Sequence, residues 1–190
     1  MAKLYFTYSA MNAGKSAILL QAAHNYRERG MQVMLWTSGE GAADPDETMG
    51  TIESRIGLVA EAHLFREDTD LVEAIGSEKP DAVFVDEAQF LSEAQVWDMA
   101  KVADDLGIPV LCYGLRTDFQ GQLFPGSATL LAIADDLREA RTICHCGKKA
   151  TMNLRRDGTG EAVREGEQVG VEKGDYVPLC RKHFREALDI

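Results

Sequence analysis

The chain has 190 residues, of which 45% are hydrophobic and 27% charged, and its formal net charge at pH 7 is −11. This composition is typical of a globular protein with one substantial core and room for a small satellite. The acidic balance disfavours nucleic-acid binding as a main role, because an acidic surface repels a phosphate backbone. No apolar run approaches the roughly 20 residues of a membrane span, and the apolar N-terminal run is shorter than a signal-peptide core, so we expect a cytoplasmic protein.

The first predicted elements are a strand over residues 3–9 and a helix that begins after Lys15 and ends at Gly30. A strand, a loop ending in Gly-Lys-Ser and a helix form the context of a phosphate-binding P-loop, whose backbone N–H groups surround the phosphates of a nucleoside triphosphate. Lys15 would reach the outer phosphates, and the Ser16 hydroxyl would bind Mg²⁺. Ser9 stands where the strict pattern has Gly, so a chance Gly-Lys-Ser is the alternative.

Strands and helices continue to alternate up to about residue 140. Between them, residues 40–50 have no periodicity and are predicted to form a mobile surface loop. The alternation predicts a parallel α/β sheet with right-handed crossovers. The further elements predicted here are a buried strand at 33–36, a helix at 68–78, a buried strand at 82–85, a helix begun by a capping box of Ser92 and Gln95, and a strand at 110–113.

Two adjacent carboxylates, Asp86 and Glu87, follow the predicted strand at 82–85. In open α/β sheets ligands bind at this edge. One carboxylate fits the Walker-B position, which holds Mg²⁺ directly or through water, and Glu87 is available as a base for an attacking hydroxyl or water. Because adjacent strand residues face opposite ways, we expect one at the metal and the other at the substrate. The alternative is an acidic start to a helix.

The loop over residues 114–126 leaves the sheet at the same edge. Phe119 and Phe124 stand there among Gly, Asp and Gln residues, as the walls of a site for a flat ring would. Both could instead be core residues that anchor the loop. Arg116 or Arg55 could neutralise a transferring phosphate, although lone arginines are more often solvated.

From residue 141 the pattern changes to β-like pieces at 152–154 and 168–171, Gly- and charge-rich turns, and a short final helix. Three thiolates and one imidazole are available as a closed structural zinc site, with His145 expected to point away. Zinc would hold residues 147–179 as a loop suited to closing over a ligand. Free cysteines and a surface histidine are the alternative. The predicted zinc ligands are Cys144, Cys146, Cys180 and His183.

Together these motifs resemble the type II thymidine kinases, the zinc-containing family, and in particular its bacterial branch. Ser9 in place of the first Gly is the form found in that branch. The resemblance implies a P-loop NTPase (RecA-like) parallel sheet flanked by helices over residues 1–140, and a small zinc-binding β-rich domain with a lasso loop over 141–190. It covers nearly the whole chain and rests on Tyr8-Ser9-Ala10-Met11-Asn12-Ala13-Gly14-Lys15-Ser16, Ser54-Arg55-Ile56-Gly57, Val85-Asp86-Glu87-Ala88-Gln89-Phe90, Cys112-Tyr113-Gly114-Leu115-Arg116-Thr117-Asp118-Phe119 and Cys180-Arg181-Lys182-His183.

The resemblance implies transfer of the ATP γ-phosphate to the 5′-hydroxyl of thymidine, and of deoxyuridine, in nucleoside salvage. It implies Glu87 as the catalytic base, Mg²⁺ with ATP, structural Zn²⁺, a homotetramer and feedback inhibition by thymidine triphosphate (dTTP). The implied ATP and Mg²⁺ residues are Ser9, Ala10, Met11, Asn12, Ala13, Gly14, Lys15, Ser16, Asp86, Glu87, Ala88, Gln89 and Arg55. The implied thymidine residues are Phe119, Phe124, Tyr176, Gln168, Val169, Gly170 and Val171. The lasso departs from the Val-Ile-Gly-Gly of many relatives, because this chain reads Gly170-Val171-Glu172-Lys173-Gly174.

Two other functions stay open on the sequence. One is a P-loop motor or switch ATPase acting on nucleic acid, since Asp86-Glu87-Ala88-Gln89 is similar to helicase Walker-B strings. The net charge of −11, the small size and the lack of further nucleotide-sensing arginine motifs oppose it. The other is a zinc-stabilised binding module with a vestigial nucleotide site, which the intact Lys15, Ser16 and Glu87 oppose.

Overall fold

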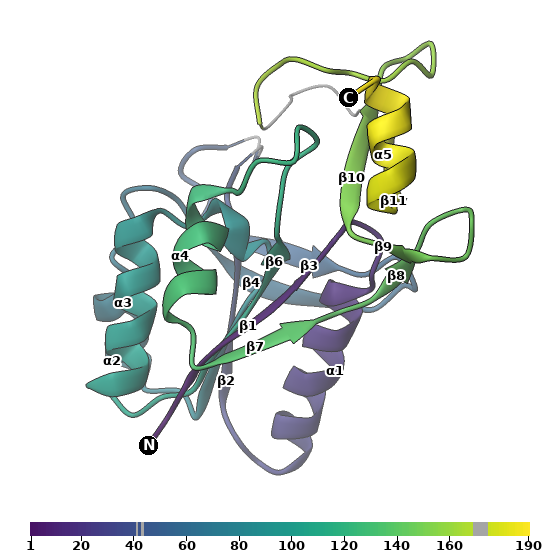
Figure 1. The fold of residues 1–190 in the computed structure, drawn as a ribbon. Helices are drawn as coiled ribbons and strands as arrows, with labels where there is room; N and C mark the ends of the chain where they lie inside the picture. Colours follow the sequence, from purple (N-terminus) through teal and green to yellow (C-terminus); the bar gives the residue numbers. More distant parts are fainter. Residues whose placement is uncertain (41, 43, 169–174) are drawn as a thin grey trace.

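The computed structural model describes residues 1–40, 42, 44–168 and 175–190. A seven-stranded sheet with helices on both faces forms the larger part, and two small sheets with the final helix form a C-terminal part beside it (Figure 1). The strands are β1 (Leu4–Ser9), β2 (Val33–Ser38), β3 (Met49–Glu53), β4 (Val59–Phe65), β5 (Ala82–Val85), β6 (Val110–Leu115), β7 (Asp136–Glu139), β8 (Thr142–Ile143), β9 (Lys149–Ala150), β10 (Met152–Arg156) and β11 (Asp175–Leu179). The helices are α1 (Lys15–Glu28), α2 (Leu71–Glu78), the 3₁₀ turn η1 (Ala88–Phe90), α3 (Glu93–Asp104), α4 (Pro125–Ile133) and α5 (Arg181–Leu188).

The large sheet has the strand order β3-β4-β2-β5-β6-β1-β7. Its strands pair in parallel, except that β3 runs antiparallel to β4. This confirms the predicted α/β fold and adds a β3–β4 hairpin at one edge. The carboxyl ends of β1, β5 and β6 therefore meet at one edge of the sheet, where the P-loop, the Asp86-Glu87 pair and the loop at 114–126 all begin.

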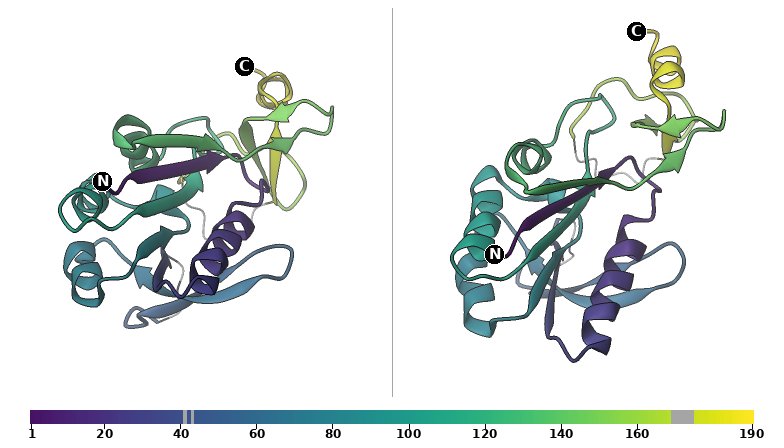
Figure 2. Two further views of the ribbon diagram at one scale, coloured as in Figure 1. Left: turned by 90° about the horizontal axis from the view of Figure 1, so that it is seen from below. Right: turned by 60° about the horizontal axis from the view of Figure 1, so that its bottom comes forward.

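Apolar side chains on both faces hold the helices to the sheet. All four residues of β5 are buried, and they alternate between two cores. Val83 and Val85 lie in the core beneath α2, α3 and α4, while Ala82 and Phe84 lie in the core beneath α1. Figure 2 shows α1 on one face of the sheet and α2, α3 and α4 on the opposite face. Burial on both faces explains the uninterrupted apolar run of this strand.

Several predicted boundaries move in the structure. The helix predicted from residue 68 begins at Leu71, because Asp70 caps it by accepting the Glu73 backbone N–H at 2.9 Å. The capping box of Ser92 and Gln95 is confirmed at the start of α3. The loop predicted over 40–50 ends earlier, because its last two residues belong to β3. Of the piece predicted at 168–171, Gln168 lies outside any strand, and 169–171 lie outside the described residues.

The C-terminal part has its own small core. Strand β10 pairs antiparallel with β11, and α5 packs on this pair through Phe184 and Leu188, next to Leu154 and Leu179. Two of the predicted zinc ligands, Cys144 and Cys180, are buried in this core. Among the residues that the structure describes, no helix is long and apolar enough to cross a membrane.

Candidate active site

The P-loop between β1 and α1 forms one wall of a cavity of about 370 Å³. Gly14 has the left-handed φ of +77° and stands at the N-cap of α1, a conformation that favours glycine. No side chain of the described residues caps this helix and no acidic residue lies in its first turn, so its first N–H groups are available to an anion. The residues lining the cavity are Met11, Asn12, Ala13, Gly14, Lys15, Ser16, Ala17, Glu53, Ser54, Arg55, Ile56, Glu87 and Leu115.

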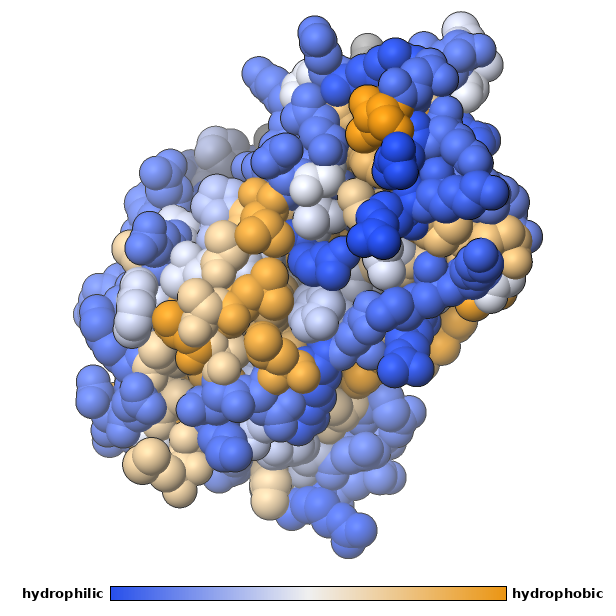
Figure 3. All heavy atoms as spheres, viewed as in Figure 1, coloured by the Kyte–Doolittle hydropathy of each residue, from blue (hydrophilic) through white to orange (hydrophobic). Residues whose placement is uncertain are grey.

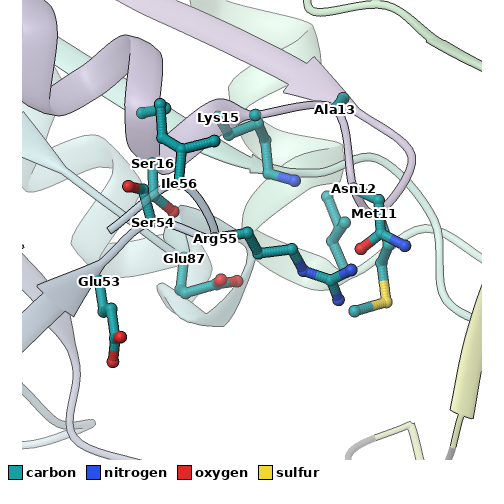
Figure 4. Close-up of a pocket in the computed structure, with 13 residues that line it drawn as sticks. Met11, Asn12, Ala13, Lys15, Ser16, Glu53, Ser54, Arg55, Ile56 and Glu87 are labelled. Carbon is teal, nitrogen blue, oxygen red and sulfur yellow. The ribbon is translucent and has the colours of Figure 1, made fainter. Parts of the chain in front are cut away.

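Charged groups from three parts of the chain converge in this cavity. Figure 4 shows Lys15 of the P-loop, Arg55 of the β3–β4 hairpin and Glu87 pointing into the same space. Lys15 is buried, and this burial lowers the pKa of its ammonium, while the nearby carboxylates of Glu87 and Asp86 act in the opposite direction. A triphosphate would supply the counter-charge that the two cations need.

Asp86 lies beneath the cavity rather than in its wall. The side chain is 4% exposed, and its Oδ1 has no hydrogen-bond partner among the described residues. Burial, and then the neighbouring Glu87 carboxylate, raise the pKa of Asp86 to about 6, although the Ser16 hydroxyl and Lys15 lower it. A buried carboxylate oxygen without a partner, next to a P-loop serine, fits the ligand set of a divalent cation such as Mg²⁺.

Glu87 reaches the cavity because the chain turns there. Strand β5 ends at Val85, and Glu87 has the left-handed φ of +51° before the turn η1. The two carboxylates therefore diverge through this turn, and the expectation that they alternate as strand neighbours is wrong. A non-glycine residue in this conformation costs about 1–3 kcal/mol and is typical of functional sites. Gln89 donates its amide N–H to Glu87 Oε2 and accepts the Leu115 backbone N–H at 2.9 Å, which orients the carboxylate.

A second cavity, of about 240 Å³, lies on the other side of Glu87. Phe119 and Phe124 are 1% and 4% exposed and both line it, so they are anchored residues and walls at once. Phe90 packs edge-on against Phe124 with ring centres 5.8 Å apart, and the Arg155 guanidinium lies 5.4 Å from the centre of the Phe119 ring. The lining residues are Met11, Glu87, Gln89, Phe90, Leu115, Asp118, Phe119, Phe124, Asn153, Gln168 and Tyr176.

The two cavities meet at Met11, Glu87 and Leu115, which line both. One cavity is bounded by the P-loop and the cations of Lys15 and Arg55, and the other by aromatic rings and amides. A carboxylate at their junction can contact groups bound on either side. This arrangement suits the transfer of a group between two bound molecules.

The structure brings together most of the residues that the sequence analysis assigned to ATP and Mg²⁺, namely 11–16, Arg55 and Glu87. Ser9 and Ala10 are buried behind the loop, Ala88 is buried in η1, and Gln89 lines the second cavity instead. Of the residues assigned to thymidine, Phe119, Phe124, Gln168 and Tyr176 line the second cavity, and Val169, Gly170 and Val171 lie outside the described residues. Arg116 lines neither cavity and donates to the Thr151 carbonyl at 3.1 Å.

Sequence reasoning missed several cavity residues. Glu53, Ser54 and Ile56 enter the first cavity on the hairpin tip, beside the Arg55 that was assigned. The Ser-Arg-Ile-Gly stretch marks this segment in the sequence, but no feature of the neighbouring residues indicates that it folds toward the P-loop. Asn153 enters the second cavity from β10, and its position follows only from the packing of the C-terminal part.

The predicted zinc ligands Cys144, Cys146, Cys180 and His183 come together, with all four ligand atoms within 4.8 Å of one another. Cys146 Sγ and Cys180 Sγ are 3.9 Å apart, and His183 Nδ1 lies 3.3 Å from Cys144 Sγ and 3.4 Å from Cys180 Sγ. Two sulfurs at about 2.3 Å from one tetrahedral zinc would lie about 3.8 Å apart, so the geometry fits the ion. His145 is not part of this group, yet it does not point away, because its ring packs on His183 with centres 4.2 Å apart.

Comparison with known proteins agrees with this geometry. The family model described as thymidine kinase matches residues 2–184. Thymidine kinase of Novosphingobium aromaticivorans is 60% identical, covering 99% of each chain, and that of Ruegeria pomeroyi is 59% identical, covering 98% of this chain and 96% of its own. Thymidine kinase of Vibrio cholerae is 54% identical, covering 99% of each chain. The chain belongs to the thymidine kinase family.

Proposed function

We propose that this chain is an ATP-dependent thymidine kinase, which transfers the γ-phosphate of ATP to the 5′-hydroxyl of thymidine and gives dTMP and ADP. The observation that carries this proposal is the junction of the two cavities at Glu87. The family and the relatives named above support the same reaction. A motor ATPase needs one nucleotide cavity and a nucleic-acid surface, whereas this chain has a second cavity, lined by aromatic rings, next to the first.

In the proposed reaction the 5′-oxygen of the nucleoside attacks the γ-phosphorus of ATP. A bond forms between them, the bond from the γ-phosphorus to the β,γ-bridging oxygen breaks, and ADP leaves. Glu87 takes the proton of the 5′-hydroxyl, and Gln89 holds its carboxylate toward the junction. Glu87 lines both cavities, so ATP in one and the nucleoside in the other would both lie beside its carboxylate, and most of the catalytic effect would come from positioning.

The donor site is assigned to the P-loop residues 11–16, with Lys15 and Arg55 placed to neutralise charge on the outer phosphates. Ser16 and Asp86 would hold Mg²⁺, which supplies charge neutralisation on the phosphates when bound. Ser9, Ala10, Ala88 and Gln89 would act by shaping these loops, because none of them lines the donor cavity.

The acceptor site is assigned to the aromatic cavity. Phe119 would stack on the thymine ring, with Phe124 and Tyr176 completing the apolar walls. Gln168 donates to Asp118 Oδ2 at 2.9 Å, which ties the start of the lasso to the loop that carries Phe119. Contacts of the base with Val169, Gly170 and Val171 stay a prediction. Deoxyuridine, which lacks only the methyl group, is a proposed second substrate.

We assign residues 1–140 to a nucleotide-binding domain and 141–190 to a zinc-binding domain that covers the acceptor site. The separate small core around Leu154 and Phe184 supports this division. The role of the Zn²⁺ is structural, because four protein ligands leave no open position.

Three further properties belong to the same proposal: a homotetramer, inhibition by dTTP, and a cytoplasmic location. Figure 3 shows apolar side chains gathered over α4 and the neighbouring β7, where Leu137 is 47% exposed. An uncovered apolar surface of this kind supports self-association. The adjoining cavities support dTTP inhibition, since one molecule could place its base in the acceptor cavity and its phosphates toward the P-loop.

The test is phosphate transfer from γ-labelled ATP to a panel of nucleosides. We expect label in the 5′-monophosphates of thymidine and deoxyuridine, with little transfer to purine nucleosides. ATP hydrolysis without labelled thymidine monophosphate, stimulated by DNA, would show that the chain is a nucleic-acid-dependent ATPase instead.

A further inference from the structure

Asn153 is a buried amide that joins three functional segments. It lies on β10 of the C-terminal part and is 1% exposed. Its Oδ1 accepts the backbone N–H of Met11 in the P-loop at 2.7 Å, across 142 residues of sequence. Its Nδ2 donates to the backbone carbonyl of Thr117 at 2.9 Å, at the start of the loop that carries Phe119.

The direction of these two bonds is unambiguous. With Oδ1 toward the Met11 N–H and Nδ2 toward the Thr117 carbonyl, each donor meets an acceptor. If the amide were flipped, its NH₂ would face the Met11 N–H and its oxygen would face the Thr117 carbonyl oxygen, and neither pair could form a hydrogen bond. Both backbone partners therefore require an amide at this position. Both bonds join neutral groups; the bond to Thr117 is buried and the bond to Met11 is partly buried, so losing either leaves a main-chain polar group without this partner.

Arg116 makes a second link between the P-loop strand and the C-terminal part. Arg116 donates its backbone N–H to the Ser9 carbonyl at 3.2 Å and its guanidinium to the Thr151 carbonyl at 3.1 Å. The ends of β1 and β6 and the start of β10 thus meet at one point. Strand β10 is itself positioned by its pairing with β11, in which Asn153 faces Pro178 and Arg155 faces Tyr176.

We propose that Asn153 is a positioning residue. Its two bonds fix the P-loop and the loop at 114–126, which carries Phe119, relative to each other, and so couple the position of the C-terminal domain to the donor site. On the proposed kinase function, on which this rests, donor binding depends on a side chain outside the nucleotide-binding domain. Met11 lines both cavities, so a displacement of its backbone changes the geometry at their junction.

The decisive measurement is the affinity for a non-hydrolysable ATP analogue with Mg²⁺, in the absence of any nucleoside. Asn153→Leu keeps the approximate size of the side chain and removes both bonds. We expect it to weaken binding of the analogue about tenfold, which corresponds to about 1.4 kcal/mol, and to lower kcat by about 10²-fold through misalignment. A residue that only lines the acceptor cavity would leave the affinity for the analogue unchanged.

Two further variants separate positioning from stability. Leu154 is the next residue in the sequence, and its side chain lies in the small core and makes no hydrogen bond to either loop. Leu154→Ala should therefore lower the melting temperature without changing the affinity of the folded protein for the analogue. Asn153→Asp keeps the acceptor for Met11 and loses the donor for Thr117. It should lose less affinity for the analogue than Asn153→Leu and raise the KM for thymidine.

Wild-type affinity of Asn153→Leu for the analogue would overturn the proposal, and so would an equal loss in Leu154→Ala or Asn153→Asp. If Asn153→Leu does not fold, Asn153→Ala, which also removes both bonds, takes its place with the same expected loss of affinity for the analogue. Failure of the wild-type chain to phosphorylate thymidine would refute the proposed function alone, because the affinity for the ATP analogue needs no acceptor.

Discussion

Replacing Asp86 by Asn should make the unliganded protein more stable and the enzyme less active. In the folded chain the pKa of Asp86 is raised from 3.8 to about 6, first by burial and then by Glu87. At a pH well above both values, this difference corresponds to about 3 kcal/mol of lost stability. Asn carries no charge at any pH, so Asp86→Asn should recover this free energy.

The sign of the pH dependence follows from the raised pKa. The stability associated with Asp86 is fully present below about pH 3.8, where the carboxyl is protonated in both states, and it is lost as the pH rises through about 6. The advantage of Asp86→Asn should therefore be about 3 kcal/mol at pH 8 and roughly half of that at pH 5. For a chain of this length it corresponds to a rise of about 6–12 °C in melting temperature at pH 8.

The assay is urea unfolding of nucleotide-free and magnesium-free protein at both pH values. Asp104→Asn, an exposed carboxylate at the end of α3, controls for the removal of one negative charge from a chain of net charge −11. Calorimetry should show weakened binding of the ATP analogue with Mg²⁺ in Asp86→Asn and unchanged binding in the control. A variant no more stable than wild type at pH 8, or an advantage that is the same at both pH values, would refute the reasoning.

Three other changes test the site. Glu87→Gln should lower kcat by about 10²- to 10⁴-fold while the ATP analogue still binds, because only the proton acceptor is lost, and turnover like that of wild type would exclude Glu87 as the base. Phe119→Leu should raise the KM for thymidine roughly tenfold and leave the KM for ATP unchanged, since stacking is worth about 0.5–1.5 kcal/mol, and a rise in both constants would contradict the assignment. Cys146→Ser should lower the zinc content, expected at about one ion per chain, and melt the C-terminal domain first, as followed by metal analysis and hydrogen exchange of β10. An unaltered zinc content would contradict the ligand set.

The elements that could be predicted from the sequence are those with a strong local signal. The four residues of β5 are apolar and bounded by Pro80 and by two carboxylates, and the capping box marks the start of α3 within one residue. The P-loop and the zinc ligands have fixed spacings, because their chemistry requires particular atoms close together. Their grouping in the structure agrees with the pattern.

The remaining parts depend on tertiary contacts. In β3 of the β3–β4 hairpin only Ile52 is buried, so the alternation of apolar and polar residues is weak. The Ser54 hydroxyl holds the tip of the hairpin, since it donates to the Leu58 carbonyl and accepts the Leu58 backbone N–H. Helix α4 has no clear division into an apolar and a polar face, and periodicity alone could not separate it from a buried strand. The links from Asn153 span 142 and 36 residues and leave no mark in the local sequence.

The turn that carries Glu87 illustrates why a site can depend on residues that contact no substrate. The turn η1 packs closely against Gly114 of β6 on one side and Gly126 of α4 on the other. A Cβ at Gly114 would lie 2.9 Å from the backbone nitrogen of Gln89, and one at Gly126 would lie 2.4 Å from the Leu91 carbonyl oxygen and 2.9 Å from that of Ala88. Backbone cannot yield at such distances, so any larger residue at Gly126 must push α4 away from the turn. The left-handed conformation of Glu87 is thus stabilised by close packing from both sides, and the position of the proposed base is set by two glycines as much as by the acidic motif itself.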